Sequence, residues 1–167
     1  ICGKSLIGLQ MMSELISSRT LHKYYRCIVS GHLKGEQTIT GYLTKDEETN
    51  RVSVNHEKTA GAAYIETRYL PLKYNGQHTL LEVELITGRT HQIRAHLASI
   101  GYPIIGDYKY GRQSANKTAK ADYHITSQLL HAYRIEMPQI TGALAHLSHK
   151  VFVAEEPMIF QKVMGEN

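Results

Sequence analysis

Apolar residues recur along this chain with a helical spacing of three or four residues in some segments and with strand-like alternation in others. The first segment of the chain has the helical spacing. Leu6, Leu9, Met12 and Ile16 recur three or four residues apart within residues 4–18. This spacing puts them on one side of a helix. We therefore predict an amphipathic helix over residues 4–18.

Most other regular segments are rich in β-branched and aromatic residues and predict strands. Asn75–Gly76 is a hairpin signal between two of them, because both residues tolerate a positive φ. Pro71 indicates that the strand before this turn lies at a sheet edge, since proline has no N–H to donate. The predicted strands are residues 23–29, 38–43, 51–54, 62–74, 78–86, 129–137 and 150–153.

A second segment with helical spacing follows the predicted strand at residues 78–86. Ile93, Leu97 and Ile100 recur at helical spacing, so residues 87–101 predict a helix that turns these side chains toward the core. Gly101, with a proline two residues later, marks the end of that helix.

The rest of the chain completes the predicted architecture. Residues 112–126 are polar with little periodicity and predict a loop, whereas residues 157–164 begin with a proline that suits a first helical turn. We predict a single domain over residues 1–167. Its class is α+β, with a largely antiparallel mixed sheet and flanking helices.

Composition narrows the class of partner. The 167 residues carry 19 Lys and Arg against 15 Asp and Glu, a net charge of +4 that favours a polyanionic partner. Cys2 and Cys27 show no metal or disulfide-framework spacing, which fits a reducing, cytoplasmic setting. We expect no membrane partner, because no apolar run is long enough to span a bilayer. His91 and His96 diverge around a helix, so we expect no metal site.

The densest polar chemistry begins at Thr87–Gly88, between a predicted strand and a predicted helix. Arg89, His91, Gln92 and Arg94 follow directly. A helix start presents unpaired N–H groups and a positive dipole end, which suit a phosphate or carboxylate. Arg94 lies at the edge of the apolar face, so it should be partly buried and paired. Spacing alone leaves two partners open: a structural Glu, or an anion belonging to a functional site.

Three segments resemble the signature of the RluA-type pseudouridine synthases. Residues 85–97 and 101–111 resemble the principal motif of that family. Residues 22–31 are similar to its Lys-x-Tyr-x-Ala-x-Val motif, with Cys27 where alanine is usual, and residues 129–136 resemble its late Leu-His-Ala strand. The segments occur in the family's order and span most of the chain, and the resemblance implies a mixed sheet with flanking helices.

The resemblance also implies an RNA-modifying isomerase that uses no cofactor and no metal. Such enzymes detach a uridine from its ribose, rotate the base and reattach it through carbon 5, with the nucleotide flipped from its stack. Tyr25 matches the active-site tyrosine, whose ring would stack on the base. Arg94 matches the arginine expected to pair with the catalytic aspartate. We therefore expect Tyr25 and Arg94 to be catalytic.

Other side chains are expected to contact RNA or to support the turn, with solvated loop charges as the alternative for the last two. They are Arg89, His91, Gln92, Lys109 and Arg112. The resemblance makes ribosomal RNA the expected partner, with transfer RNA as the alternative, for a protein that we expect to be a monomer.

The family's essential aspartate belongs to an Arg-Leu-Asp-x-x-Thr-Ser-Gly motif. Counting back from Tyr25 puts that motif before Ile1, so we expect this chain to lack the catalytic residue. Asp46 and Asp122 lie in polar turns, and we interpret Asp107 as a structural residue of a Gly-Asp turn. We then predict that Arg94 lies in a vacant, positively charged pocket and that the chain alone has no synthase activity.

Two other functions remain open at this point. A non-catalytic RNA-binding module would keep the fold without the nucleophile, and an upstream aspartate would distinguish the enzyme from it. A hydrolase using His91 or His131 is disfavoured, because no nucleophile with a partnered base appears at recognisable spacing.

Overall fold

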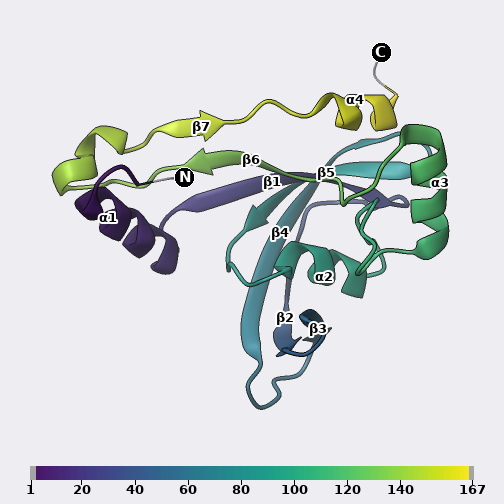
Figure 1. The fold of residues 1–167 in the computed structure, drawn as a ribbon, viewed down its shortest axis with the longest axis horizontal. Helices are drawn as coiled ribbons and strands as arrows, with labels where there is room; N and C mark the ends of the chain where they lie inside the picture. Colours follow the sequence, from purple (N-terminus) through teal and green to yellow (C-terminus); the bar gives the residue numbers. More distant parts are fainter. Residues whose placement is uncertain (1–2, 166–167) are drawn as a thin grey trace.

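A seven-stranded sheet organises residues 3–165, which are the residues that the computed structural model describes (Figure 1). The strand order is β3-β2-β4-β5-β1-β6-β7, and every pairing between neighbours is antiparallel. The predicted α+β class with a largely antiparallel sheet is therefore confirmed. In chain order the elements are α1 (Leu6–Ser17), β1 (His22–Ser30), β2 (Gln37–Asp46), β3 (Arg51–Asn55), β4 (Ala63–Tyr74), β5 (His78–Leu85), α2 (Gln92–Ser99), α3 (Gln113–Tyr123), β6 (Leu130–Glu136), the 3-10 helix η1 (Gly142–Leu147), β7 (Val151–Val153) and α4 (Met158–Met164).

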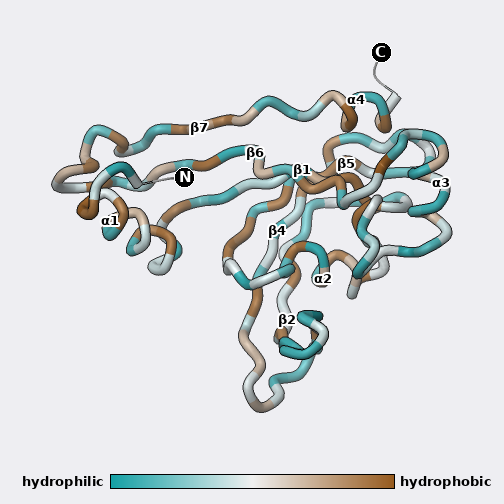
Figure 2. The backbone as a smooth tube through the Cα atoms, in the orientation of Figure 1, coloured by the Kyte–Doolittle hydropathy of each residue, from teal (hydrophilic) through white to brown (hydrophobic). Residues whose placement is uncertain are grey.

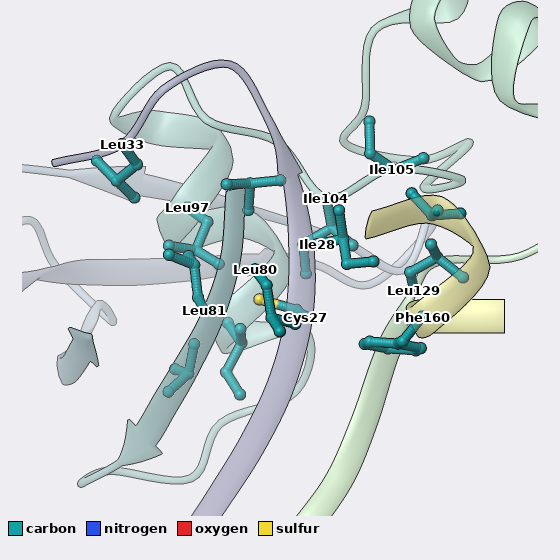
Figure 3. Close-up of a cluster of buried hydrophobic side chains, with 14 of the residues drawn as sticks. Cys27, Ile28, Leu33, Leu80, Leu81, Leu97, Ile104, Ile105, Leu129 and Phe160 are labelled. Atoms are coloured by element: carbon teal, nitrogen blue, oxygen red, sulfur yellow. The ribbon is translucent and has the colours of Figure 1, made fainter. Parts of the chain in front are cut away.

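The main core lies where β1 and β5 meet α2. Cys27, Leu81 and Leu97 are completely buried there, and Figure 3 shows them among the packed aliphatic side chains. Figure 2 shows the same concentration of hydrophobic backbone positions where β1 crosses β5. Cys27 therefore fills an alanine-sized position of the motif as a core residue, and burial raises the pKa of its thiol.

Helix α1 packs on a smaller cluster at the far end of β1. Met12 is buried there against Leu21, Met137 and Ile140. The other members of the predicted stripe, Leu6, Leu9 and Ile16, are between 44% and 70% exposed. The spacing correctly predicted the helix, but residues 3–165 provide no layer that covers this side of it.

Two helix boundaries differ from the prediction. The helix expected from residue 87 begins at Gln92, because His91 has a left-handed backbone (φ 56°) that cannot continue a helix. The segment expected to be a loop forms α3. The sequence pattern is weak because only Asn116 and Ala119 of this helix are buried. The helix ends at His124, whose backbone is in the left-handed region.

The sheet also corrects the expectation for Pro71. Strand β4 lies between β2 and β5 and is not an edge strand. Proline is tolerated because pairing with β2 ends at Tyr69, and the register with β5 shifts between Pro71 and Lys73. The N–H that proline lacks would therefore lie beyond the pairing with β2 and at the irregularity in the pairing with β5. No helix within residues 3–165 is both long and apolar enough to cross a bilayer.

Candidate active site

Tyr25 lies on the face of the sheet that α2 covers. It pairs with Val83 of β5 and Ala132 of β6, so the three side chains share one face. Val83 in turn pairs with Tyr69 of β4, two residues from Thr67, whose hydroxyl is 3.0 Å from Nδ1 of His96 in α2. Strand β1 therefore directs Tyr25 toward the helical side of the sheet.

A cleft of about 470 Å³ opens beside Tyr25, and we call it the β1–β6 cleft. Helix α1 contributes Ile16 to one wall, and the last strand contributes Phe152. The phenol of Tyr25 is half-buried, and burial raises its pKa, so the hydroxyl stays protonated at neutral pH. The lining includes Ile16, Lys23, Tyr25, Ala132, Ile135 and Phe152. The polar groups of the lining are the phenols of Tyr24, Tyr25 and Tyr133, the Lys23 ammonium and the Arg134 guanidinium. A flat nucleobase fits a cleft of this size with aromatic rings in its lining.

The strand-to-helix turn is held from inside by Gln92. Its Nε2 donates to the carbonyl of Glu66 and to the hydroxyl of Thr67, at 3.0 Å each. Its Oε1 accepts from the Thr87 hydroxyl at 2.9 Å and from the Arg89 N–H at 3.1 Å. Gln92 is 2% exposed, so its amide is saturated within the protein and supports the turn; it does not face solvent as an RNA contact would.

Arg94 has a partner, contrary to the predicted vacant pocket. Its Nε and Nη2 donate to the two carboxylate oxygens of Asp107 at 2.7 and 2.8 Å. Asp107 is completely buried and also accepts the N–H groups of Lys109 and Tyr110. The prediction that Arg94 lacks a partner was wrong. The alternative left open by spacing, a structural carboxylate, is the correct one, with an Asp in place of the expected Glu.

Asp107 is ionised in this arrangement. Burial raises the pKa of its carboxyl, but the bidentate Arg94 and the two backbone N–H donors outweigh burial and lower the pKa below its usual value. Conversely, the hydrogen bond to Asp107 raises the pKa of Arg94. The pair locks α2 to the turn at residues 106–111, in agreement with a structural role for Asp107.

Two of the expected RNA contacts are tied to their neighbours. The Lys109 ammonium donates to the backbone carbonyls of Thr49 and Asn50 in the β2–β3 turn. Nδ1 of His91 is 3.0 Å from the Tyr110 hydroxyl, and burial, followed by the charge of Arg94, lowers the pKa of His91. These contacts join the β2–β3 hairpin to the α2 turn.

The remaining two expected contacts, Arg89 and Arg112, are exposed. Arg112 donates to the carbonyl of Gly101 at 3.0 Å. The guanidinium of Arg89 has no hydrogen-bond or ion-pair partner within residues 3–165. Arg89 follows Gly88, and a Cβ placed on Gly88 would lie 3.5 Å from the Lys23 ammonium in the cleft. Arg89 is therefore the arginine of the motif whose side chain is exposed and without a partner within residues 3–165.

Comparison with known proteins identifies the family. Residues 1–99 match the sequence model of a family described as RNA pseudouridylate synthase. The chain belongs to this family. The match covers the Tyr25 strand, the turn at Thr87–Gly88 and helix α2, whereas the part of the cleft lined by residues 132–135 and 152–154 lies outside it.

Similar proteins extend the match beyond residue 99. The chain is 35% identical over 129 residues to ribosomal large subunit pseudouridine synthase D of Nitrosomonas europaea, covering 75% of this chain and 36% of that protein. It is 29% identical over 161 residues to ribosomal large subunit pseudouridine synthase D of Borreliella burgdorferi, covering 96% and 45%. The chain thus spans less than half the length of these relatives.

A solved structure shares the fold. Human RNA pseudouridylate synthase domain containing 4 superposes with a TM-score of 0.74 at 22% identity, over 97% of this chain and 68% of that one. This likeness supports the arrangement of the sheet and helices.

Sequence reasoning missed the role of Lys23. It was quoted as part of a motif, but no function was assigned to it. The available signal was its position two residues before Tyr25, which puts both side chains on one face of a strand.

Proposed function

We propose that this chain is part of the catalytic domain of an RNA pseudouridine synthase, which isomerises uridine to pseudouridine in ribosomal RNA. The observation that carries the proposal is Tyr25 beside an apolar cleft that also holds the Lys23 ammonium, which has no hydrogen-bond or ion-pair partner within residues 3–165. Family membership supplies the reaction class. Transfer RNA is the second candidate substrate, and we propose that the protein acts as a monomer in the cytoplasm.

Tyr25 would hold the flipped uridine. Its ring offers a stacking surface on the cleft floor, and aromatic stacking on a base contributes about 1–3 kcal/mol. The reaction breaks the bond between N1 and the ribose and forms a bond from C5 to the same carbon. N1 gains a proton and C5 loses one, so the isomerisation is balanced without a cofactor.

The cleft needs a carboxylate that residues 3–165 do not provide. Asp46 accepts the N–H groups of Glu48 and Thr49 in an exposed turn, and Asp107 is occupied by Arg94. Asp122 is exposed on α3. We propose that a segment N-terminal to this chain supplies the carboxylate, and that Arg89 pairs with it in place of Arg94.

Tritium release tests the proposal, because the reaction removes the hydrogen at C5. Ribosomal RNA labelled with tritium at C5 of uridine would be incubated with the full gene product and with this chain alone. We expect release by the former and none by the latter. Turnover by the chain alone would contradict the missing carboxylate, and no release by the full gene product would contradict the function.

Tyr25→Ala in the full gene product should reduce tritium release at least roughly tenfold, since the stacking surface is lost. Tyr108→Ala is the matched control, because Tyr108 is 58% exposed and lies outside the cleft lining. An equal effect of the two substitutions would show that Tyr25 has no special role.

A further inference from the structure

Basic side chains on the two faces of the central strands differ in whether they have an acidic partner. On the face opposite α2, each arginine has a carboxylate partner: Arg26 with Glu156 at 2.9 Å, and Arg68 with Glu84 at 2.6 Å. Arg134 likewise pairs with Glu82 at 2.9 Å. On the α2 face, the ammonium of Lys23 lies in the β1–β6 cleft and has no hydrogen-bond or ion-pair partner within residues 3–165.

The surroundings of Lys23 are apolar and positive. Its pKa is lowered first by burial and then by the charge of Arg19. Gly88 approaches from the other side, since a Cβ there would lie 3.5 Å from Nζ of Lys23. Arg89 follows Gly88, and neither Arg89 nor Arg19 has a hydrogen-bond or ion-pair partner for its side chain in the described part of the chain. Lys23 therefore has a positive neighbour, Arg19, and no carboxylate partner within residues 3–165.

Such an arrangement is unfavourable unless an anion occupies it. A partly buried charge is stabilised by an opposite charge or by hydrogen bonds to its donors. Lys23 has three donors and a positive neighbour, Arg19, and it lines the cleft. The missing counter-charge is specific to Lys23, because Arg134, the other cation that lines the cleft, is paired with Glu82.

We propose that Lys23, with Arg19 as its positive neighbour, binds an RNA phosphodiester adjacent to the nucleotide held at Tyr25. The inference rests on the proposed function, because it assumes that RNA enters the cleft. A phosphodiester fits because a base on Tyr25 brings its own backbone to the cleft mouth, where the lysine can act as a point-charge donor. Lys23 fixes the backbone and contributes no base selectivity.

Salt dependence of RNA binding is the direct test. Anisotropy of a labelled single-stranded RNA would be measured at several salt concentrations for the chain, for Lys23→Gln and for Lys162→Gln. Losing one phosphate contact on a single strand lowers the slope of log affinity against log salt by about 0.7. We expect that loss for Lys23→Gln, equally for RNAs of different sequence. Lys162 is an exposed lysine on α4, so its substitution should not change the slope.

Gly88 provides a second test that keeps Lys23 in place. Its surroundings are open apart from Nζ of Lys23, and its φ does not require glycine, so a side chain is tolerated. Gly88→Asp puts a carboxylate next to the ammonium and should weaken RNA binding and lower the salt slope. Gly88→Asn has nearly the same shape without the charge and should retain the slope.

Each outcome is decisive. If the chain binds RNA with a salt slope that Lys23→Gln leaves unchanged, the phosphate site is refuted while RNA binding stands. If the chain shows no salt-dependent RNA binding, the proposed function fails first. Should Lys23→Gln lower the melting temperature of the full gene product but leave RNA binding intact, the partner is a protein carboxylate and the phosphate assignment is overturned.

Discussion

At the scale of single residues, the distinction that matters is between cations that have partners and cations that do not. Arg94 and Arg89 stand five positions apart in the same motif. Arg94 is fixed by two hydrogen bonds to a buried carboxylate, whereas Arg89 is exposed and its guanidinium has no partner within residues 3–165. Residue type and spacing could not separate them, because the partner of Arg94 comes from a turn that only the fold brings close.

The Arg94–Asp107 pair should be essential for stability. Asp107→Ala leaves Arg94 partly buried without its counter-charge and removes the acceptor of two backbone N–H groups. We expect a loss of about 3–5 kcal/mol in the free energy of unfolding, measured by urea denaturation. Arg112→Gln is the control and should change stability by less than about 0.5 kcal/mol, since Arg112 is exposed. A small effect of Asp107→Ala would mean that the pair does not hold the turn.

His96 should make stability depend on pH. It is 1% exposed, and burial lowers the pKa of its imidazole from 6.5 to about 4. The unfolded chain therefore binds a proton between pH 6.5 and about 4 that the folded chain does not, so this stabilisation is present above pH 6.5 and declines as pH falls toward 4. The loss is on the order of 3 kcal/mol.

Denaturation of the chain and of His96→Gln across this range would measure the effect. The variant should be less stable at pH 7, because the packing around His96 is disturbed. Its stability should also fall less between pH 6.5 and 4. Parallel pH curves for the two proteins would contradict a buried neutral imidazole.

At the scale of elements, strands were easier to predict than helix ends. The hairpin at Asn75–Gly76 followed from local chemistry, and the structure has it: Gly76 has a φ of 98°, and the Asn75 side chain accepts two backbone N–H groups. By contrast, the start of α2 depends on the left-handed backbone of His91, and α3 has only a short buried side. Neither feature leaves a strong periodic signal.

In the candidate site, too, features set by local sequence could be predicted and features set by tertiary contacts could not. Tyr25 could be identified from its motif, because strand periodicity fixes the face to which it points. The saturation of Gln92 and the anchoring of Lys109 could not be identified, since their partners come from β4 and from the β2–β3 turn. From sequence alone, a polar residue near a predicted site could either contact a ligand at the surface or hydrogen-bond within the protein. Only the tertiary contacts distinguish these two roles.

At the scale of the whole molecule, the structure combines a large core with a small one. The large core joins β1, β5, α2 and α4, whereas α1 is attached through the cluster around Met12. Figure 1 shows α1 at the opposite end of the molecule from α4. Because Ile16 of α1 lines the β1–β6 cleft, one wall of the candidate site belongs to the weakly attached part.

This arrangement predicts uneven hydrogen exchange. Amides of α1 should exchange much faster than those of β5, because local opening of α1 exposes little additional apolar surface. Adding a single-stranded RNA should slow exchange in α1, since a ligand in the cleft contacts the wall that Ile16 provides, while β5 should change little. Mass spectrometry of peptides from the two elements would measure both effects. Equal protection of α1 and β5 in the free chain would mean that α1 belongs to the main cooperative unit, and RNA binding would then have no reason to act selectively on it.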